Sequence, residues 1–141
     1  MKFDCDRKEF IDPKTGEAKT FYWPQINCHL QKRGFSVVPL RCLLDSGADV
    51  TVFPIELCGI FGVDLKKVIK GEMEGVGGIE VPSYTVSYDM HQMGIIIPGL
   101  EVVVKESISF CLGQHTPLLG RNFFKYFEIV FQRGGKAFEI S

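Results

Sequence analysis

The segment from Cys42 to Pro54 constrains the fold more than any other part of the chain. It runs from an apolar, strand-like stretch into Asp45-Ser46-Gly47 and then back into an apolar and β-branched stretch. Asp-Ser-Gly alone is ordinary turn chemistry, but the apolar flanks on both sides favour a functional interpretation. Ser46 offers a short hydroxyl, and Gly47 permits a tight turn that another backbone can approach. We therefore expect two buried strands that hold the Asp45 carboxylate at a tight turn, in a position where it can take part in a reaction.

A second segment, Pro117 to Phe124, also runs from an apolar stretch through Gly120 and Arg121 into a helix-like apolar stretch. Together, Leu-Leu-Asp-Ser-Gly-Ala-Asp and the later Leu-Leu-Gly-Arg-Asn resemble the two signature segments of the retropepsins. These are the retroviral-type aspartic proteases, with their retrotransposon and cellular relatives. The resemblance covers residues 35–131. It implies a mainly all-β fold, which is a single-domain closed β-barrel of the retropepsin type with one or two short helices.

The resemblance also assigns roles to individual residues. It identifies Asp45, Ser46 and Gly47 as the catalytic triplet, in its Ser form. Asp49 and Arg121 match positions that pair beneath the active-site floor in such folds. A planar Arg side chain can bind a carboxylate at two points and brace the loop that carries it. The alternative for Arg121 is a solvated charge at the start of a helix.

Between the two segments lies a glycine-rich stretch, Gly71 to Pro82. Its glycines permit the backbone geometry of a mobile β-flap, which closes over bound peptide in retropepsins. A phosphate-binding loop is the alternative, but such a loop precedes a helix and brings a Lys with Ser or Thr. Ile79-Glu80-Val81 is strand-like instead. The expected substrate-binding residues are Ala48, Asp49, Val52, Gly75, Val76, Gly77, Gly78 and Leu118.

The single Asp-Ser-Gly has a consequence for how an active site is assembled. Aspartic proteolysis needs two carboxylates around one water. The chain has one such triplet, and 141 residues are too few for two lobes. We expect a homodimer with Asp45 of each subunit on the two-fold axis, hydrolysing extended peptides without metal or other cofactor. The alternative is a catalytically silent retropepsin-like dimerisation or peptide-binding module.

Composition narrows the remaining possibilities. Hydrophobic residues make up 45% of the chain, enough for one sizeable core. The net charge of −1 argues against a nucleic-acid surface, for which a basic stripe is expected. No apolar run approaches about 20 residues and no signal peptide is evident, which indicates a cytoplasmic protein without membrane partners. The five cysteines have no spacing that indicates zinc or a disulfide framework.

We expect one domain over residues 1–141. Residues 1–30 form an N-terminal extension or hairpin, and residues 128–141 form a C-terminal hairpin around Gly134-Gly135. Helices are expected at residues 54–61 and 122–127. Strands are expected on both sides of a polar turn at residues 12–16 and of another at residues 31–34, and also at residues 83–88, 94–104 and 107–112.

Overall fold

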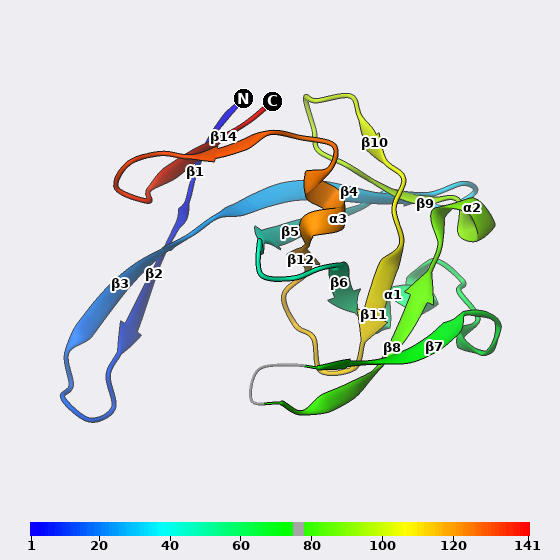
Figure 1. Ribbon diagram of the computed structural model, residues 1–141, viewed down its shortest axis with the longest axis horizontal. Coiled ribbons are helices and arrows are strands. Elements are labelled where there is room, and N and C mark those ends of the chain that lie inside the picture. The colour runs from blue at the N-terminus through cyan, green and yellow to red at the C-terminus, as the bar shows by residue number, and fades with distance from the viewer. Residues whose placement is uncertain (75–77) are drawn as a thin grey trace.

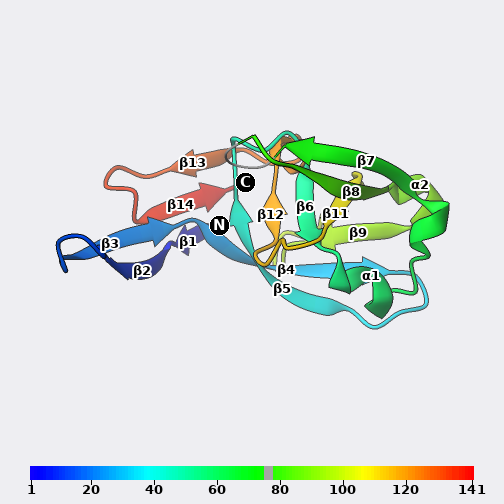
Figure 2. The same cartoon turned by 90° about the horizontal axis from the view of Figure 1, so that it is seen from below.

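The computed structural model describes residues 1–74 and 78–141, which are built mainly from strands (Figure 1). Nine strands of this part form the largest sheet: β4 Gln25–Lys32, β5 Val38–Leu44, β6 Thr51–Pro54, β7 Ile69–Glu74, β8 Glu80–Val86, β9 Met93–Ile96, β10 Val103–Val104, β11 Ile108–Cys111 and β12 Leu118–Leu119. Their spatial order is β10-β9-β4-β5-β12-β6-β11-β8-β7. The sheet curls into a half barrel (Figure 2), and the expected mainly β fold class is confirmed.

The short strand β12 decides how the two signature segments meet. It runs parallel to β5 and antiparallel to β6, and Leu118 is paired with both Leu43 of β5 and Val52 of β6. Since β5 leads into the Asp45 turn and β6 leads out of it, β12 lies between the two strands that flank this turn. The residues that follow β12 are therefore held beside Asp45.

Apolar side chains on the inner face of the curled sheet form one core. In β4 the side chains of Ile26, Cys28 and Leu30 are fully buried, whereas Asn27 between them is exposed. This period of two is the pattern of a strand with one face in a core. The largest fully buried side chains are the rings of Phe53, Phe61, Phe110, Phe123 and Phe138. The last of these lies near the C-terminus, so the terminal strands share the core.

Two smaller sheets accompany the large one, and the first of them contains both ends of the chain. Strands β1 Lys2–Asp4, β13 Ile129–Phe131 and β14 Ala137–Ile140 form a sheet of order β1-β14-β13, in which the two termini are adjacent. Strands β2 Asp6–Ile11 and β3 Ala18–Trp23 pair with each other across a polar turn. We call residues 6–23 the arm, because Figures 1 and 2 show this hairpin projecting away from the half barrel.

Helices are short. They are α1 Glu56–Ile60, the 3-10 helix η1 Leu65–Lys67, α2 Tyr88–His91 and α3 Arg121–Phe124. Helices were expected around α1 and α3, but none was expected at α2. The hydroxyl of Ser87 accepts a hydrogen bond from the Met90 backbone N–H at 3.4 Å, so Ser87 is the capping signal that could have indicated α2. No helix in the described residues is long and apolar enough to cross a membrane.

The expectation of one strand over residues 94–104 is wrong. Strands β9 and β10 are two arms of a hairpin in which Ile96 is paired with Val103. The chain reverses near Pro98 and Gly99, and Gly99 has a φ of +92°. Proline has no N–H for a sheet ladder, and glycine adopts this left-handed conformation without steric strain. The Pro-Gly pair therefore breaks an otherwise apolar run.

Candidate active site

Asp45 is the first residue after β5, and backbone hydrogen bonds hold it in place. Its N–H donates to the Leu119 carbonyl at 3.0 Å, and its carbonyl accepts a hydrogen bond from the Ala48 N–H at 3.2 Å. The Gly47 N–H donates to Asp45 Oδ1 at 2.9 Å. The turn therefore fixes both the backbone and the carboxylate of Asp45, and the half-buried side chain stays accessible.

The segment after β12 packs against the other side of this turn. The Arg121 N–H donates to the Ala48 carbonyl at 2.8 Å. A Cβ on Gly120 would lie 2.2 Å from the Val50 carbonyl oxygen and 2.9 Å from that of Ala48. The backbone of Gly120 is extended, so glycine is needed here for space and not for its dihedral angles.

A buried polar network joins the two segments. Thr51, which is 2% exposed, accepts a hydrogen bond from the Gly120 N–H at 3.2 Å and donates one to Asn122 Oδ1 at 2.9 Å. Asn122 Nδ2 in turn donates to the Ser107 carbonyl at 3.0 Å. Neither Thr51 nor Asn122 was expected from the sequence to have a role at the site. A threonine inside the apolar run of β6 is the signal that could have indicated a buried partner.

The structure brings Asp49 and Arg121 together as an ion pair. The two side chains are nevertheless exposed, by 77% for Asp49 and 63% for Arg121. The two residues pair as expected, but in the single subunit the pair lies on the surface, and Asp49 borders the cleft described next. Water screens such a pair, so its contribution to stability is about 0–1 kcal/mol.

A cleft of about 810 Å³ opens beside the Asp45 turn. The expected site residues that line it are Asp45, Gly47, Ala48, Asp49, Val52 and Leu118. Eight further lining residues were not expected from the sequence: Val50, Met73, Glu74, Val81, Cys111, Leu112, Gly113 and Gln114. Four of these belong to the β7–β8 hairpin or to the end of β11, which are remote in sequence from the signature segments. The lining of the cleft is thus mixed, with apolar side chains around the carboxylates of Asp45, Asp49 and Glu74.

The hairpin of β7 and β8 forms one wall of this cleft. Met73 and Val81 are directly paired across the two strands, and both line the cleft. The thiol of Cys111 donates to the Met73 sulfur at 3.6 Å, which links this wall to β11. The structure therefore places a β-hairpin along the cleft in the region where a flap was expected.

The remaining expected residues of the site are placed as follows. Ser46 is exposed in the turn after Asp45. Gly78 precedes β8 with a φ of +74°. Gly75, Val76 and Gly77 lie outside the described residues.

The cysteine side chains near the site are unsuited to nucleophilic chemistry. A hydrogen bond with the Cys28 thiol, together with burial, raises the pKa of Cys42. Burial also raises the pKa of Cys111, and it raises the pKa of Cys58 to about 11. Protonated thiols are poor nucleophiles and poor metal ligands. Within residues 1–74 and 78–141, no group of three His, Cys, Asp or Glu side chains is placed to hold a metal ion.

Comparison with solved structures relates this geometry to a known fold. The chain is similar to EIAV protease in its complex with the inhibitor HBY-793, with a TM-score of 0.50 and 20% sequence identity. The match covers 74% of this chain and 86% of the viral protease. No protein-family model and no curated protein matches the sequence. The chain thus has a fold of the retropepsin type, and the likeness concerns the fold alone.

Proposed function

We propose that this chain is an aspartic endopeptidase that works as a homodimer, with one Asp45 from each subunit. One observation supports the proposal above all. In a fold of the retropepsin type, the Asp45 carboxylate lies among apolar side chains in a cleft, where the Gly47 N–H holds it at 2.9 Å. A carboxylate that merely terminated a turn would have no need of a cleft.

The second carboxylate comes from the partner subunit. A single Asp-Ser-Gly per chain supplies one acid, whereas water activation by aspartates needs a pair that shares one proton, because two like charges in contact do not both ionise. A two-fold axis beside Asp45 provides the pair with no further residue.

The reaction follows from the two protonation states. The ionised Asp45 takes a proton from the shared water, whose oxygen attacks the scissile carbonyl carbon. The protonated Asp45 of the partner subunit donates a hydrogen bond to the carbonyl oxygen. When the tetrahedral intermediate breaks down, a proton passes to the leaving amine and the two carboxyl groups exchange roles.

The substrate is an extended peptide. Val52 and Leu118 form an apolar floor beside the acid, and Met73 and Val81 form the wall contributed by the hairpin. Ala48 is small and lies in the turn after Asp45, which leaves room for a peptide backbone. Apolar side chains of the substrate would enter the cleft, and their burial would hold the scissile bond against the acid.

Cleavage of a diverse peptide library, with and without a statine-type transition-state analogue, tests the proposal. We expect cleavage that the analogue inhibits and that Asp45→Asn abolishes, since the amide is isosteric but cannot act as a base. Asp89→Asn is the matched control: Asp89 is exposed on α2 and does not border the cleft.

Two results would contradict the proposal. Turnover that survives Asp45→Asn would remove this residue from the mechanism. Binding of peptides and of the analogue without any cleavage, in the wild-type dimer, would favour the silent module instead.

A further inference from the structure

The arm has an apolar face that the described residues cover only in part. The side chains of Phe10 and Phe21 are 46% and 47% exposed. An isolated two-stranded hairpin is only marginally stable in water, and clustered exposed apolar groups mark an interaction surface. The arm is therefore built to contact another surface.

The register of the arm defines the chemistry of this face. Lys8 is directly opposite Phe21, and side chains alternate along each strand, so Lys8, Phe10, Phe21 and Trp23 share one face. Phe10 packs edge-on against Phe21 with ring centroids 5.5 Å apart, and it stacks on Trp23 at 6.0 Å. The Lys8 ammonium lies 5.8 Å from the centroid of the Trp23 ring. We call these four residues the aromatic face; it combines three rings with a cation that has no acidic partner in the described structure.

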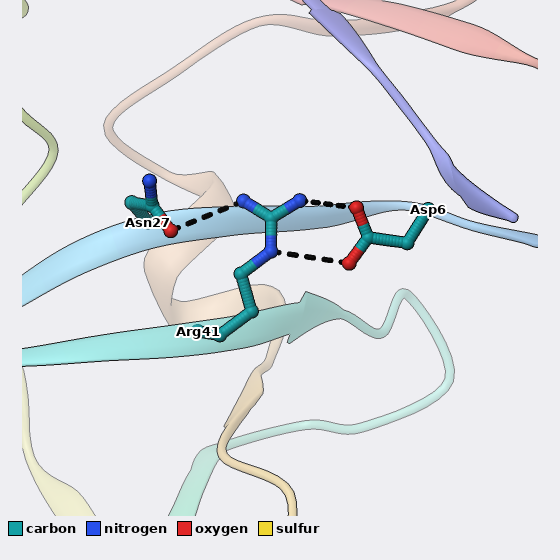
Figure 3. A network of polar contacts seen from close by, with 3 residues as sticks. All are labelled: Asp6, Asn27 and Arg41. Atoms are coloured by element: carbon teal, nitrogen blue, oxygen red, sulfur yellow. Dashed lines mark hydrogen bonds and ion pairs between the residues drawn. The ribbon is translucent and has the colours of Figure 1, made fainter.

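The base of the arm is fixed beside the candidate active site. The N–H of Leu44, the residue before Asp45, donates to the Pro24 carbonyl at 2.9 Å directly after β3. Arg41 of β5 binds the carboxylate of Asp6 through two nitrogen atoms and donates to Asn27 at 3.2 Å (Figure 3). The start of β2 and the end of β3 are thus both attached to the strand that delivers Asp45.

The direction of the arm follows from the same attachments. Figures 1 and 2 show the arm leaving the half barrel on the side where β5 ends, and it extends beyond the barrel. A strand of six residues spans about 20 Å. If two Asp45 carboxylates meet on a two-fold axis, an arm that starts next to Asp45 and points away from its own barrel is placed to reach the partner subunit.

The β7–β8 hairpin of a second copy offers a surface of complementary charge. In Figure 1 the arm descends to the level of the β7–β8 hairpin. Strand β7 is an end strand of the large sheet, so one of its edges is unpaired. Glu72, Glu74 and Glu80 are exposed on one face of this hairpin together with Lys70, so this face is acidic on balance. An acidic face is complementary in charge to the Lys8 ammonium of the aromatic face.

We propose that the arm embraces the second copy of the chain, with its aromatic face against the partner's β7–β8 hairpin. This inference rests on the proposed function, because the shared site is the reason for a two-fold axis beside Asp45. In this arrangement each arm supports the hairpin wall of the partner's cleft only while the dimer is assembled. A subunit alone would then lack both the second Asp45 carboxylate and the contact that supports its β7–β8 hairpin.

The double variant Phe10→Ser, Phe21→Ser tests the aromatic face. We expect the dimer dissociation constant, measured by sedimentation velocity, to rise roughly 100-fold, as truncation of two aromatic anchors does at an interface. Ile11→Ser is the matched control, since Ile11 lies on the opposite face of β2 and is more exposed. An unchanged dissociation constant in a variant whose circular dichroism is normal would overturn the embrace.

A charge exchange tests the partner surface. Lys8→Glu should weaken the dimer about tenfold, and the added change Glu72→Lys should restore most of this loss. Restoration by Glu72→Lys would place the aromatic face on the partner's hairpin. Loss without restoration would overturn that placement.

Hydrogen exchange gives a test that needs no variant: the amides of residues 7–11 should gain protection as protein concentration rises. Protection that depends on added peptide instead would assign the arm to substrate.

The failure of this inference and that of the proposed function give different results. If the aromatic-face variants dimerise and cleave peptides like the wild type, the embrace is wrong and the protease stands. If the variants lose activity only on dilution and regain the wild-type rate per dimer at high concentration, both stand. If the wild type dimerises through the arm but cleaves nothing, the embrace stands without the protease.

Discussion

Arg121 donates a hydrogen bond to the carboxylate of Asp49 from 72 positions further along the chain, yet both side chains remain exposed to solvent. The same two segments are joined a second time by their backbones. The N–H of Arg121 donates to the Ala48 carbonyl at 2.8 Å, and that of Asn122 donates to the Asp49 carbonyl at 3.3 Å. The backbone bonds do not depend on side-chain charge, so the contact between the segments does not depend on the ion pair.

Arg121→Ala should therefore lower the free energy of unfolding by no more than about 1 kcal/mol, the range of exposed ion pairs. Urea denaturation monitored by tryptophan fluorescence measures the change. Lys125→Ala is a matched control, because it removes another exposed ion pair, with Glu106 at 2.9 Å. A loss of about 3 kcal/mol for Arg121→Ala alone would show that the pair becomes buried, as in a dimer interface.

Thr51→Val should lower the free energy of unfolding more than Arg121→Ala does. The change keeps the shape of the side chain but removes the hydroxyl that accepts from Gly120 N–H and donates to Asn122. Two buried polar groups then lose their partner, and the expected loss of stability is about 1–3 kcal/mol. Thr20→Val on the exposed side of β3 is the control for the change in strand propensity. Equal effects of the two variants would mean that the hydroxyl of Thr51 does not hold the site together.

Local signals account for what the sequence could predict. The apolar flanks of Asp45 indicate a strand, a turn and a strand, and β5 and β6 lie there. Turn residues and alternation indicate the pairing of β2 with β3, because both depend on neighbours in the chain. The order of the two signature segments further indicated the fold type that the comparison with EIAV protease supports.

What the sequence could not predict depends on contacts between distant segments. Met73 of the glycine-rich stretch and Cys111 of β11 meet in the cleft wall, 38 positions apart, and no local pattern indicates that these two residues pair. The exposure of Asp49 and Arg121 is set by how far the turn lies from the core, which residue types do not reveal. The sequence likewise does not reveal that the arm projects, because the side chains of a hairpin alternate in the same way whether or not the hairpin packs on the rest of the protein.

The thiol of Cys58 makes stability depend on pH in alkaline solution. Burial raises its pKa from the ordinary value of 9.0 to about 11 in the folded chain. Between these values the folded thiol keeps a proton that the unfolded thiol releases, so the contribution is complete below pH 9 and is lost as the pH rises toward 11. We expect the free energy of unfolding to fall with pH over this window.

Urea titrations at a series of pH values measure this slope. Cys58→Ala should make it shallower without removing it, because burial also raises the pKa of Cys111. The slope between pH 6 and 8 serves as the internal control and should not change. An identical alkaline slope in the wild type and in Cys58→Ala would contradict the assignment.

Gly120 gives the sharpest test of how the two signature segments hold Asp45. A methyl group at this position would lie 2.2 Å from the Val50 carbonyl oxygen and 2.4 Å from its carbon. Backbone atoms cannot rotate away as a flexible side chain can, so the turn or β12 must shift. We expect Gly120→Ala to lower the free energy of unfolding by about 3 kcal/mol, at the upper end for an overpacked site.

The same shift should act on the site, because the carbonyl of Leu119, next to Gly120, accepts the hydrogen bond from the Asp45 N–H at 3.0 Å. Peptide cleavage should therefore fall even at temperatures where the variant is folded, and circular dichroism defines that range. Gly59→Ala is the matched control: Gly59 is exposed in α1, nothing lies within 4 Å of an added Cβ, and alanine favours a helix by about 1 kcal/mol. A Gly120→Ala variant with the stability and cleavage rate of Gly59→Ala would show that β12 does not set the position of Asp45.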